Sequence, residues 1–300
     1  MNPRERGFLL LTSHLGDPER RVLTTAQLRS LADRVRYSRG TGEDRALSQP
    51  DLLGLGYGRE MACRILHLLD EEDRLDAYLR RAAARGCVPV TRVSPGYPLL
   101  LRQRLGLDSP GCLWARGDLE ILNTPAIALV GSRKLREPNR AFAAEAGFRA
   151  AEQGLTLVSG NARGADRTAQ QACLEAGGRV ISIVADELDR QPRLRNTLFL
   201  SEEDFDTPFS AQRALSRNRC IHALGRMVLV AQSDLGRGGT WDGTVKNLRF
   251  GWSTVACFRD GSESARKLEE MGAFLVGQED LKDLSVLPEA EVRLEGWQQT

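Results

Sequence analysis

Two turns containing glycine, serine and basic residues are the part of this sequence whose residue types could do chemistry. An apolar run, Ala126–Val130, ends in Gly131-Ser132-Arg133-Lys134, and a second, over 155–158, ends in Ser159-Gly160-Asn161-Ala162-Arg163-Gly164. Small residues let a ligand approach the backbone N–H groups, and the following helix N-termini favour anions. If both runs are strands of one parallel sheet, both turns lie at its carboxyl edge, where open α/β sheets bind ligands. The pattern predicts a phosphate site.

The distribution of charge points to the same edge. The chain has a net charge of +2, but residues 278–300 hold two basic and six acidic side chains, so residues 1–277 carry 40 − 34 = +6. No Asp or Glu occurs over 121–136, and none over 207–233, a span that includes Arg217 and Arg219. Arginine suits phosphate oxygens and nucleic-acid bases. We expect positive charge to be concentrated in these two stretches.

The elements that must position these turns follow from the alternation of strand and helix signals. Strands are expected near 126–130, 155–158, 179–184, 226–231, 253–258 and 273–276, and helices near 139–153, 164–176, 211–223, 240–250 and 262–271. This alternation predicts an α/β fold with a doubly wound, mostly parallel, Rossmann-like sheet of about six strands. Residues 188–210 match neither pattern and are expected to be irregular.

A small helical domain is expected before this sheet. Residues 5–85 show apolar positions three and four apart and no strand-like alternation. Within them, the glycines of residues 53–58 indicate either a helix-hairpin-helix element that contacts DNA or a plain turn between helices. Short strands are expected at 88–91 and 112–116. The predicted domains are a helical domain over 1–85, a Rossmann domain over 86–285 and an acidic tail over 286–300.

Several classes of protein are disfavoured by missing motifs. The turn at Gly131 has a single glycine where a dinucleotide site needs G-x-G-x-x-G, and the chain has no P-loop and no G-x-S-x-G elbow. His222 lies among arginines, and packing or hydrogen bonding is favoured for it over catalysis. The six cysteines form no C-x-x-C pair, so neither a metal site nor a disulfide framework is expected. Without a signal peptide or a long apolar segment, the chain is expected to be cytoplasmic and not membrane-bound.

Several motifs, in order, resemble the DNA-processing protein A (DprA/Smf) family over roughly residues 95–260. They are Tyr97-Pro98-Leu99, Leu113-Trp114-Ala115-Arg116-Gly117-Asp118, Val130-Gly131-Ser132-Arg133, Ser159-Gly160-Asn161-Ala162-Arg163-Gly164-Ala165-Asp166 and Ser216-Arg217-Asn218-Arg219. Ala165 and Gln170 stand where the family has isoleucine and histidine. The family's winged-helix domain is not expected after Val276.

The resemblance implies an extended Rossmann domain that binds single-stranded DNA, forms a homodimer and delivers the strand to a RecA-type recombinase in transformation or recombination. It implies no catalysis and no cofactor. Asp166 is expected to support the site by capping its helix or orienting an arginine. The expected DNA or phosphate contacts are Gly131, Ser132, Arg133, Lys134, Ser159, Gly160, Arg163, Gly164, Arg217, Asn218, Arg219, Gly238, Gly239 and Thr240.

A nucleotide-binding protein remains an alternative. The stretch Gly236-Arg237-Gly238-Gly239-Thr240 resembles the turn of phosphoribohydrolases in the wider superfamily, where a glutamate serves the chemistry. Here Asn247 occupies the glutamate's position, and an amide cannot act as a carboxylate base. Hydrolysis is therefore disfavoured, while a nucleotide sensor, for example in defence signalling, stays open.

Overall fold

A nine-stranded sheet organises the chain in a computed structural model that describes residues 1–38 and 46–287. Its strands are β1 (Cys87–Thr91), β2 (Cys112–Gly117), β3 (Ala126–Val130), β4 (Thr156–Ser159), β5 (Arg179–Ile183), β6 (Thr197–Ser201), β7 (Met227–Val230), β8 (Thr254–Phe258) and β9 (Phe274–Val276). They are ordered β1-β2-β6-β5-β4-β3-β7-β8-β9. All neighbours pair in parallel except β1 with β2 and β2 with β6. The predicted doubly wound, mostly parallel α/β fold is confirmed.

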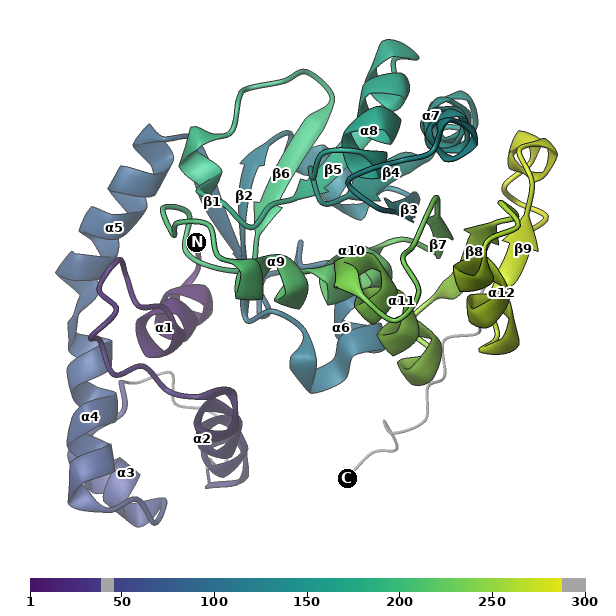
Figure 1. Cartoon of the computed structure of the whole chain (residues 1–300). Coiled ribbons are helices and arrows are strands. Elements are labelled where there is room, and N and C mark those ends of the chain that lie inside the picture. The colour runs from purple at the N-terminus through teal and green to yellow at the C-terminus, as the bar shows by residue number, and fades with distance from the viewer. Residues whose placement is uncertain (39–45, 288–300) are drawn as a thin grey trace.

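Helices cover both faces of the sheet, as the sequence predicts (Figure 1). On one face α7 (Glu137–Glu152) and α8 (Ala165–Glu175) pack against one core cluster. The other face carries α6 (Leu99–Leu105), α10 (Asn218–Leu224), α11 (Gly238–Phe250) and α12 (Glu263–Glu270). The central strands β3 and β4 are buried at every residue, since helices cover them on both sides.

Strand β6 is the main departure from the expected elements. Residues 188–210 were expected to be irregular, yet Thr197–Ser201 is a fully buried strand between β5 and β2. Its run of five residues is too short to show a period, and prolines and an acidic run surround it. With β6 and the antiparallel pair β1–β2, the sheet has nine strands where about six are expected. The helix expected over 211–223 is also divided, into α9 (Ala211–Ser216) and α10, at Arg217.

The helical region that precedes the sheet lies against β1, β2 and β6. Its helices are α1 (Pro3–Thr12), α2 (Thr25–Ser38), α3 (Gln49–Gly54), α4 (Arg59–Asp70) and α5 (Glu72–Ala84). Tyr78 of α5 packs against Trp114 of β2 and Phe205, with ring centroids 5.5 and 5.0 Å away. The three rings belong to a core cluster that also includes Leu9 and Leu75, so helices and sheet share buried apolar surface. Residues 288–300 of the expected acidic tail lie outside the described residues.

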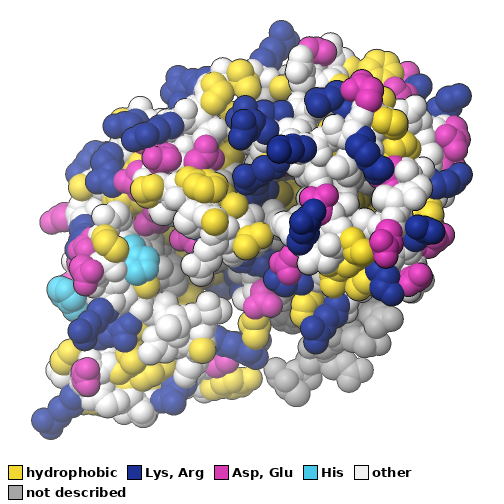
Figure 2. Space-filling model, in the orientation of Figure 1, with side chains coloured by type: hydrophobic (Ala, Val, Ile, Leu, Met, Phe, Trp, Pro, Cys, Tyr) yellow, Lys and Arg dark blue, Asp and Glu magenta, His cyan; other side chains and the backbone are white. Residues whose placement is uncertain are grey.

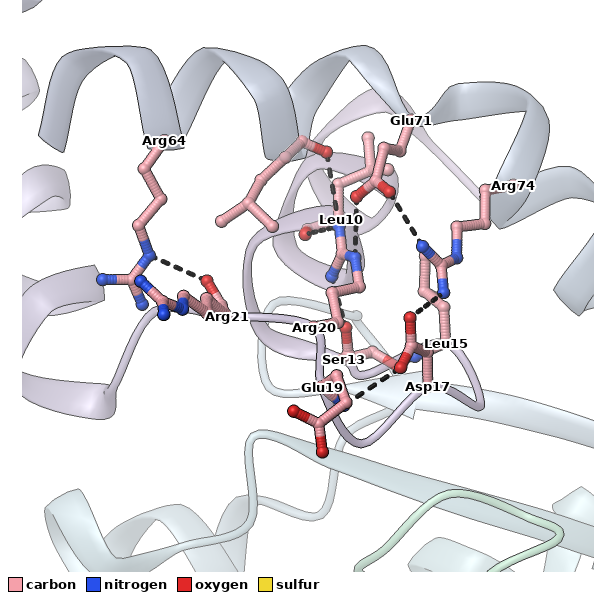
Figure 3. Close-up of polar contacts among 11 residues, drawn as sticks. Leu10, Ser13, Leu15, Asp17, Glu19, Arg20, Arg21, Arg64, Glu71 and Arg74 are labelled. Atoms are coloured by element: carbon pink, nitrogen blue, oxygen red, sulfur yellow. Dashed lines mark hydrogen bonds and ion pairs between the residues drawn. The ribbon is translucent and has the colours of Figure 1, made fainter. Parts of the chain in front are cut away.

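A buried arginine holds the helical region together (Figure 3). The side chain of Arg20 is only 3% exposed; it donates to the carbonyl oxygens of Ser13 and Leu10 and pairs with Glu71 at 2.7 Å. Although burial disfavours the charged carboxylate, Arg20 and Arg74 hold the pKa of Glu71 below its usual range. The connection between α1 and α2 is thereby tied to the junction of α4 and α5.

The glycine-rich turn of residues 53–58 joins α3 to α4. The carbonyl of Leu55 accepts a hydrogen bond from Arg34 Nη1 at 2.7 Å, and the guanidinium of Arg34 lies 4.6 Å from the ring centroid of Tyr57. The Arg34 side chain of α2 therefore occupies one side of this turn. Among the described residues, no helix combines the length and the apolar character needed to cross a membrane.

Candidate nucleic-acid interface

The candidate site lies where the order of the strands reverses. β3 pairs with β4 on one side and with β7 on the other, so the turns that follow these strands meet at one edge of the sheet. Ser132 donates its backbone N–H to the carbonyl of Gln232 after β7 at 3.0 Å, and its own carbonyl accepts from the N–H of Ala165 after β4 at 3.3 Å. The structure thus brings the predicted turns together.

Glycine is required at two positions because these turns touch. A Cβ at Gly164, where φ is +84°, would lie 2.4 Å from the carbonyl oxygen of Ser132. A Cβ at Gly131 would lie 2.5 Å from the Cβ of Ala165. At these two positions the absence of a side chain serves the contact between loops.

Asp166 supports the turn between β4 and α8. Its Oδ2 accepts hydrogen bonds from the N–H groups of Gly160 and Ala162, both at 3.1 Å. Burial raises the pKa of Asp166, while the positive charges of Arg217 and Arg133 act in the opposite direction. The N–H of Gly160, which the sequence analysis assigns to a ligand, therefore donates to a side chain of the protein itself.

Arg217 lies beneath the same turn and is buried. It is 7% exposed, and its Nη2 donates to the carbonyl of Gly160 at 2.9 Å. A Cβ at Gly160 would come within 1.7 Å of Arg217 Nη1, so this glycine makes room for the guanidinium. Burial lowers the pKa of Arg217, and the charge of Asp166 offsets part of that effect. Arg217 therefore connects the α9–α10 segment to the turn after β4, and we call an arginine with such a structural role a strut.

Ser159 and Gln170 complete the floor of the site. Gln170 stands where the resembling family has histidine, and its Nε2 donates to the hydroxyls of Ser159 at 2.5 Å and Ser182 at 3.2 Å. Both serines are fully buried at the ends of β4 and β5. Gln170 therefore fastens α8 to two strands.

The predicted residues of α10 and α11 are joined by hydrogen bonds. Asn218 Nδ2 donates to the carbonyl of Gly239 at 3.1 Å, in the first turn of α11. Arg219 pairs with Glu202 at 2.7 Å and donates to the carbonyl of Asp108 at 3.0 Å, leaving its side chain 24% exposed. Gly238 and Thr240 lie in the same first turn, with Gly238 exposed and Thr240 half-buried.

Arg133, Lys134 and Arg163 differ from the two arginines of the α9–α10 segment, because they point into solvent. All three are exposed, and their side chains form no hydrogen bond or ion pair with any residue that the structure describes. We call these three residues the cationic rim. On the face shown in Figure 2, dark-blue side chains gather near the middle, where Figure 1 shows the loops between the labels β4 and β5 and helix α9.

Two further exposed arginines belong to the same segments but are not among the contacts expected from the sequence. Arg167 is exposed in the first turn of α8 and donates to the carbonyl of Asn161 at 3.3 Å. Arg237 is exposed at the residue that precedes α11. Each is adjacent in the sequence to an expected site residue, since Arg167 follows Asp166 and Arg237 precedes Gly238. This position in the sequence is the signal that could identify them.

The position that the nucleotide alternative assigns to a catalytic glutamate lies inside α11, away from the first turn, where Gly238 and Thr240 lie. Asn247 is fully buried in α11, where its amide hydrogen-bonds to His222 Nδ1 at 3.1 Å and to the Ser253 hydroxyl at 3.0 Å. Burial lowers the pKa of His222 to about 3, so the imidazole is neutral at pH 7. The packing role favoured for His222 agrees with this placement. In the described part of the chain, His, Cys, Asp and Glu side chains form no cluster of three that could hold a metal ion.

Comparison with known proteins identifies relatives of this arrangement. The family model described as DNA recombination-mediator protein A matches residues 89–278. The DNA processing protein DprA of Streptococcus pneumoniae is 31% identical over 191 residues, covering 59% of this chain and 67% of that protein. Protein Smf of Escherichia coli is 32% identical over 184 residues, covering 56% of this chain and 49% of that protein, so the chain spans about half of its length.

Solved structures support the same fold. The X-ray structure of DprA from Streptococcus pneumoniae superposes with a TM-score of 0.64 at 23% identity, covering 86% of this chain and 97% of that one. A Helicobacter pylori DprA structure, described as showing a single-stranded DNA binding mode, gives 0.55 at 23% identity over 65% and 92% of the two chains. The family match covers more than half of the chain and includes every turn of the candidate interface; the chain belongs to the DNA recombination-mediator protein A family, which is the resemblance that its motifs predicted.

Proposed function

We propose that this chain binds single-stranded DNA along the cationic rim. The observation that carries the proposal is the set of three exposed cations, Arg133, Lys134 and Arg163, whose side chains form no hydrogen bond or ion pair with the described residues. A row of unpaired cations at one edge follows a phosphate backbone and gives binding that depends on salt. The Helicobacter pylori DprA structure, described as showing a single-stranded DNA binding mode, supports the same ligand.

In the turns after β3 and β4, the state of the backbone N–H groups favours a polyanion over a small nucleotide as the ligand. The N–H groups of Ser132, Gly160 and Ala162 are already bound to Gln232, Asp166 and Asp166 respectively. A mononucleotide sensor relies on such amides to cradle its phosphates. Side chains on the surface of the rim instead suit a strand that lies across it, and no reaction chemistry is assigned to the site.

The proposed partners follow from the family. We propose that the bound strand is delivered to a RecA-type recombinase in recombination or transformation, in keeping with the family's description as a recombination mediator. A homodimer is proposed through the edge strand β9, in which Phe274 is 47% exposed; Met271, between α12 and β9, is 40% exposed. Sedimentation of the purified chain measures its oligomeric state and so tests the proposed homodimer.

The test is fluorescence anisotropy with a labelled oligothymidine and with a duplex of the same length, over a series of salt concentrations. Neutralising three to five phosphates predicts that log K falls against log salt with a slope between about −2 and about −3.5. The single strand should bind more tightly than the duplex at every salt concentration. Binding that ignores salt, or no binding at low salt, contradicts the proposal.

A further inference from the structure

Residues 208–216, which we call the α9 platform, expose apolar surface beside the rim. Helix α9 has no buried residue. Phe209 is 56% exposed and Leu215 is 51% exposed, and Pro208 and Ala211 are exposed as well. The stretch contains no carboxylate. An uncovered apolar surface of this kind on a polar edge indicates a binding surface.

The platform is held in place by hydrogen bonds, although it is exposed. Arg213 Nη1 donates to the carbonyl of Thr207 at 2.7 Å and also to that of Pro208. The Ser210 hydroxyl accepts from the N–H of Arg213 at 3.1 Å and caps α9. Phe209 lies between these fixed residues, so its backbone is ordered before any ligand arrives.

The platform is also joined to the rim. Arg217 follows it directly and reaches the carbonyl of Gly160, in the turn that carries Arg163. On the other side, Leu215 Cδ2 lies 3.2 Å from where a Cβ of Gly239 would be, at the start of α11. The platform therefore lies between the turn after β4 and the start of α11.

We propose that the α9 platform receives the bases of the single strand, with Phe209 and Leu215 in contact with them, while the cationic rim holds the phosphates. This inference rests on the proposed function. An exposed aromatic ring stacks on a base of any sequence, and an aliphatic side chain packs against its face. In a duplex the faces of the bases are covered by their neighbours, so the platform selects single strands.

The experiment compares two labelled probes of equal length and charge: a dodecamer of thymidine and a dodecamer of abasic tetrahydrofuran units. Wild type should bind the thymidine probe roughly tenfold more tightly, since only this probe has bases to stack. Phe209→Ala and Leu215→Ala should each reduce affinity for thymidine several-fold and leave affinity for the abasic probe unchanged. The control is Phe250→Ala, which removes a 60% exposed ring at the other end of α11.

The outcomes separate this inference from the proposed function. Failure of wild type to bind either probe removes the proposed function itself. Equal affinity of wild type for both probes leaves the rim intact and overturns the platform. If Phe209→Ala or Leu215→Ala instead converts a dimer to a monomer in sedimentation, the platform is covered by a second copy of the chain, and the inference is wrong. A thermal melt of each variant checks that these exposed substitutions leave the fold intact.

Discussion

The turns after β3 and β4 and the segment that joins α9 to α10 both carry arginines at motif positions, yet the fold uses them differently. Arg133 and Arg163 are exposed and unpaired with the residues described. Arg217 is buried on the carbonyl of Gly160, and Arg219 is paired with Glu202. The comparison teaches that an arginine at a motif position of the candidate interface is either open to a ligand or a strut within the protein, depending on which carbonyl and carboxylate oxygens surround it.

Removing the buried strut should give the largest effect. Arg217→Ala leaves the carbonyl of Gly160 without this hydrogen bond and removes one of the positive charges that offset the burial of Asp166, so we expect the free energy of unfolding to fall by about 3 kcal/mol. Urea denaturation measures it. Arg217→Lys should recover part of the loss, since its ammonium can still donate. A loss no larger than that of the surface variant Arg133→Ala, about 0.5 kcal/mol or less, would show that Arg217 is not a strut.

The buried His222 should make the free energy of unfolding depend on pH. Its pKa is about 3 in the folded chain and about 6.5 when unfolded, so the unfolded state binds more protons between these values. Its contribution is complete above pH 6.5 and is lost as the pH falls toward 3. We expect wild type to lose about 2 kcal/mol more than His222→Gln between pH 6.5 and pH 4.5. Urea denaturation at each pH measures the difference, and an equal change in the free energy of unfolding of the two proteins would contradict this prediction.

The exposed side of the comparison is tested by binding. Arg133→Ala with Arg163→Ala removes two of the proposed phosphate contacts, so affinity for oligothymidine should fall about tenfold and the magnitude of the salt slope by about 1.4. The fold should be unaffected. Arg266→Ala removes an exposed arginine of α12 and serves as the matched control. Equal effects of the control and the double variant would place the DNA elsewhere.

Arg219 should give the smallest effect. Its ion pair with Glu202 is partly exposed, so Arg219→Ala should lower the free energy of unfolding by about 1 kcal/mol. Because the guanidinium is already engaged, affinity for the single strand should change less than twofold. A loss of binding comparable to that of the Arg133 and Arg163 double variant would show that DNA displaces Glu202 and would erase the distinction drawn here.

Much of the architecture could be predicted from local pattern. The six parallel strands from β3 to β9 other than β6, and the helices between them, follow from short apolar runs alternating with helical stretches. Strand β6 could not be found this way, because five buried residues show no period and their neighbours resemble a loop. Its place is decided by pairing with β5, the strand before it in the chain, and with β2, which is distant in the sequence.

The sequence by itself determined the family, the alternation of strands and helices, and the concentration of basic residues at the turns after β3 and β4. Only the tertiary structure decided which of those residues remain available. Whether a guanidinium faces water or a carbonyl oxygen depends on segments such as Gly160 and Arg217, which are 57 positions apart and meet only in the folded chain. Spacing along the chain carries no information on that meeting, because burial and hydrogen-bond partners are set by packing across the sheet.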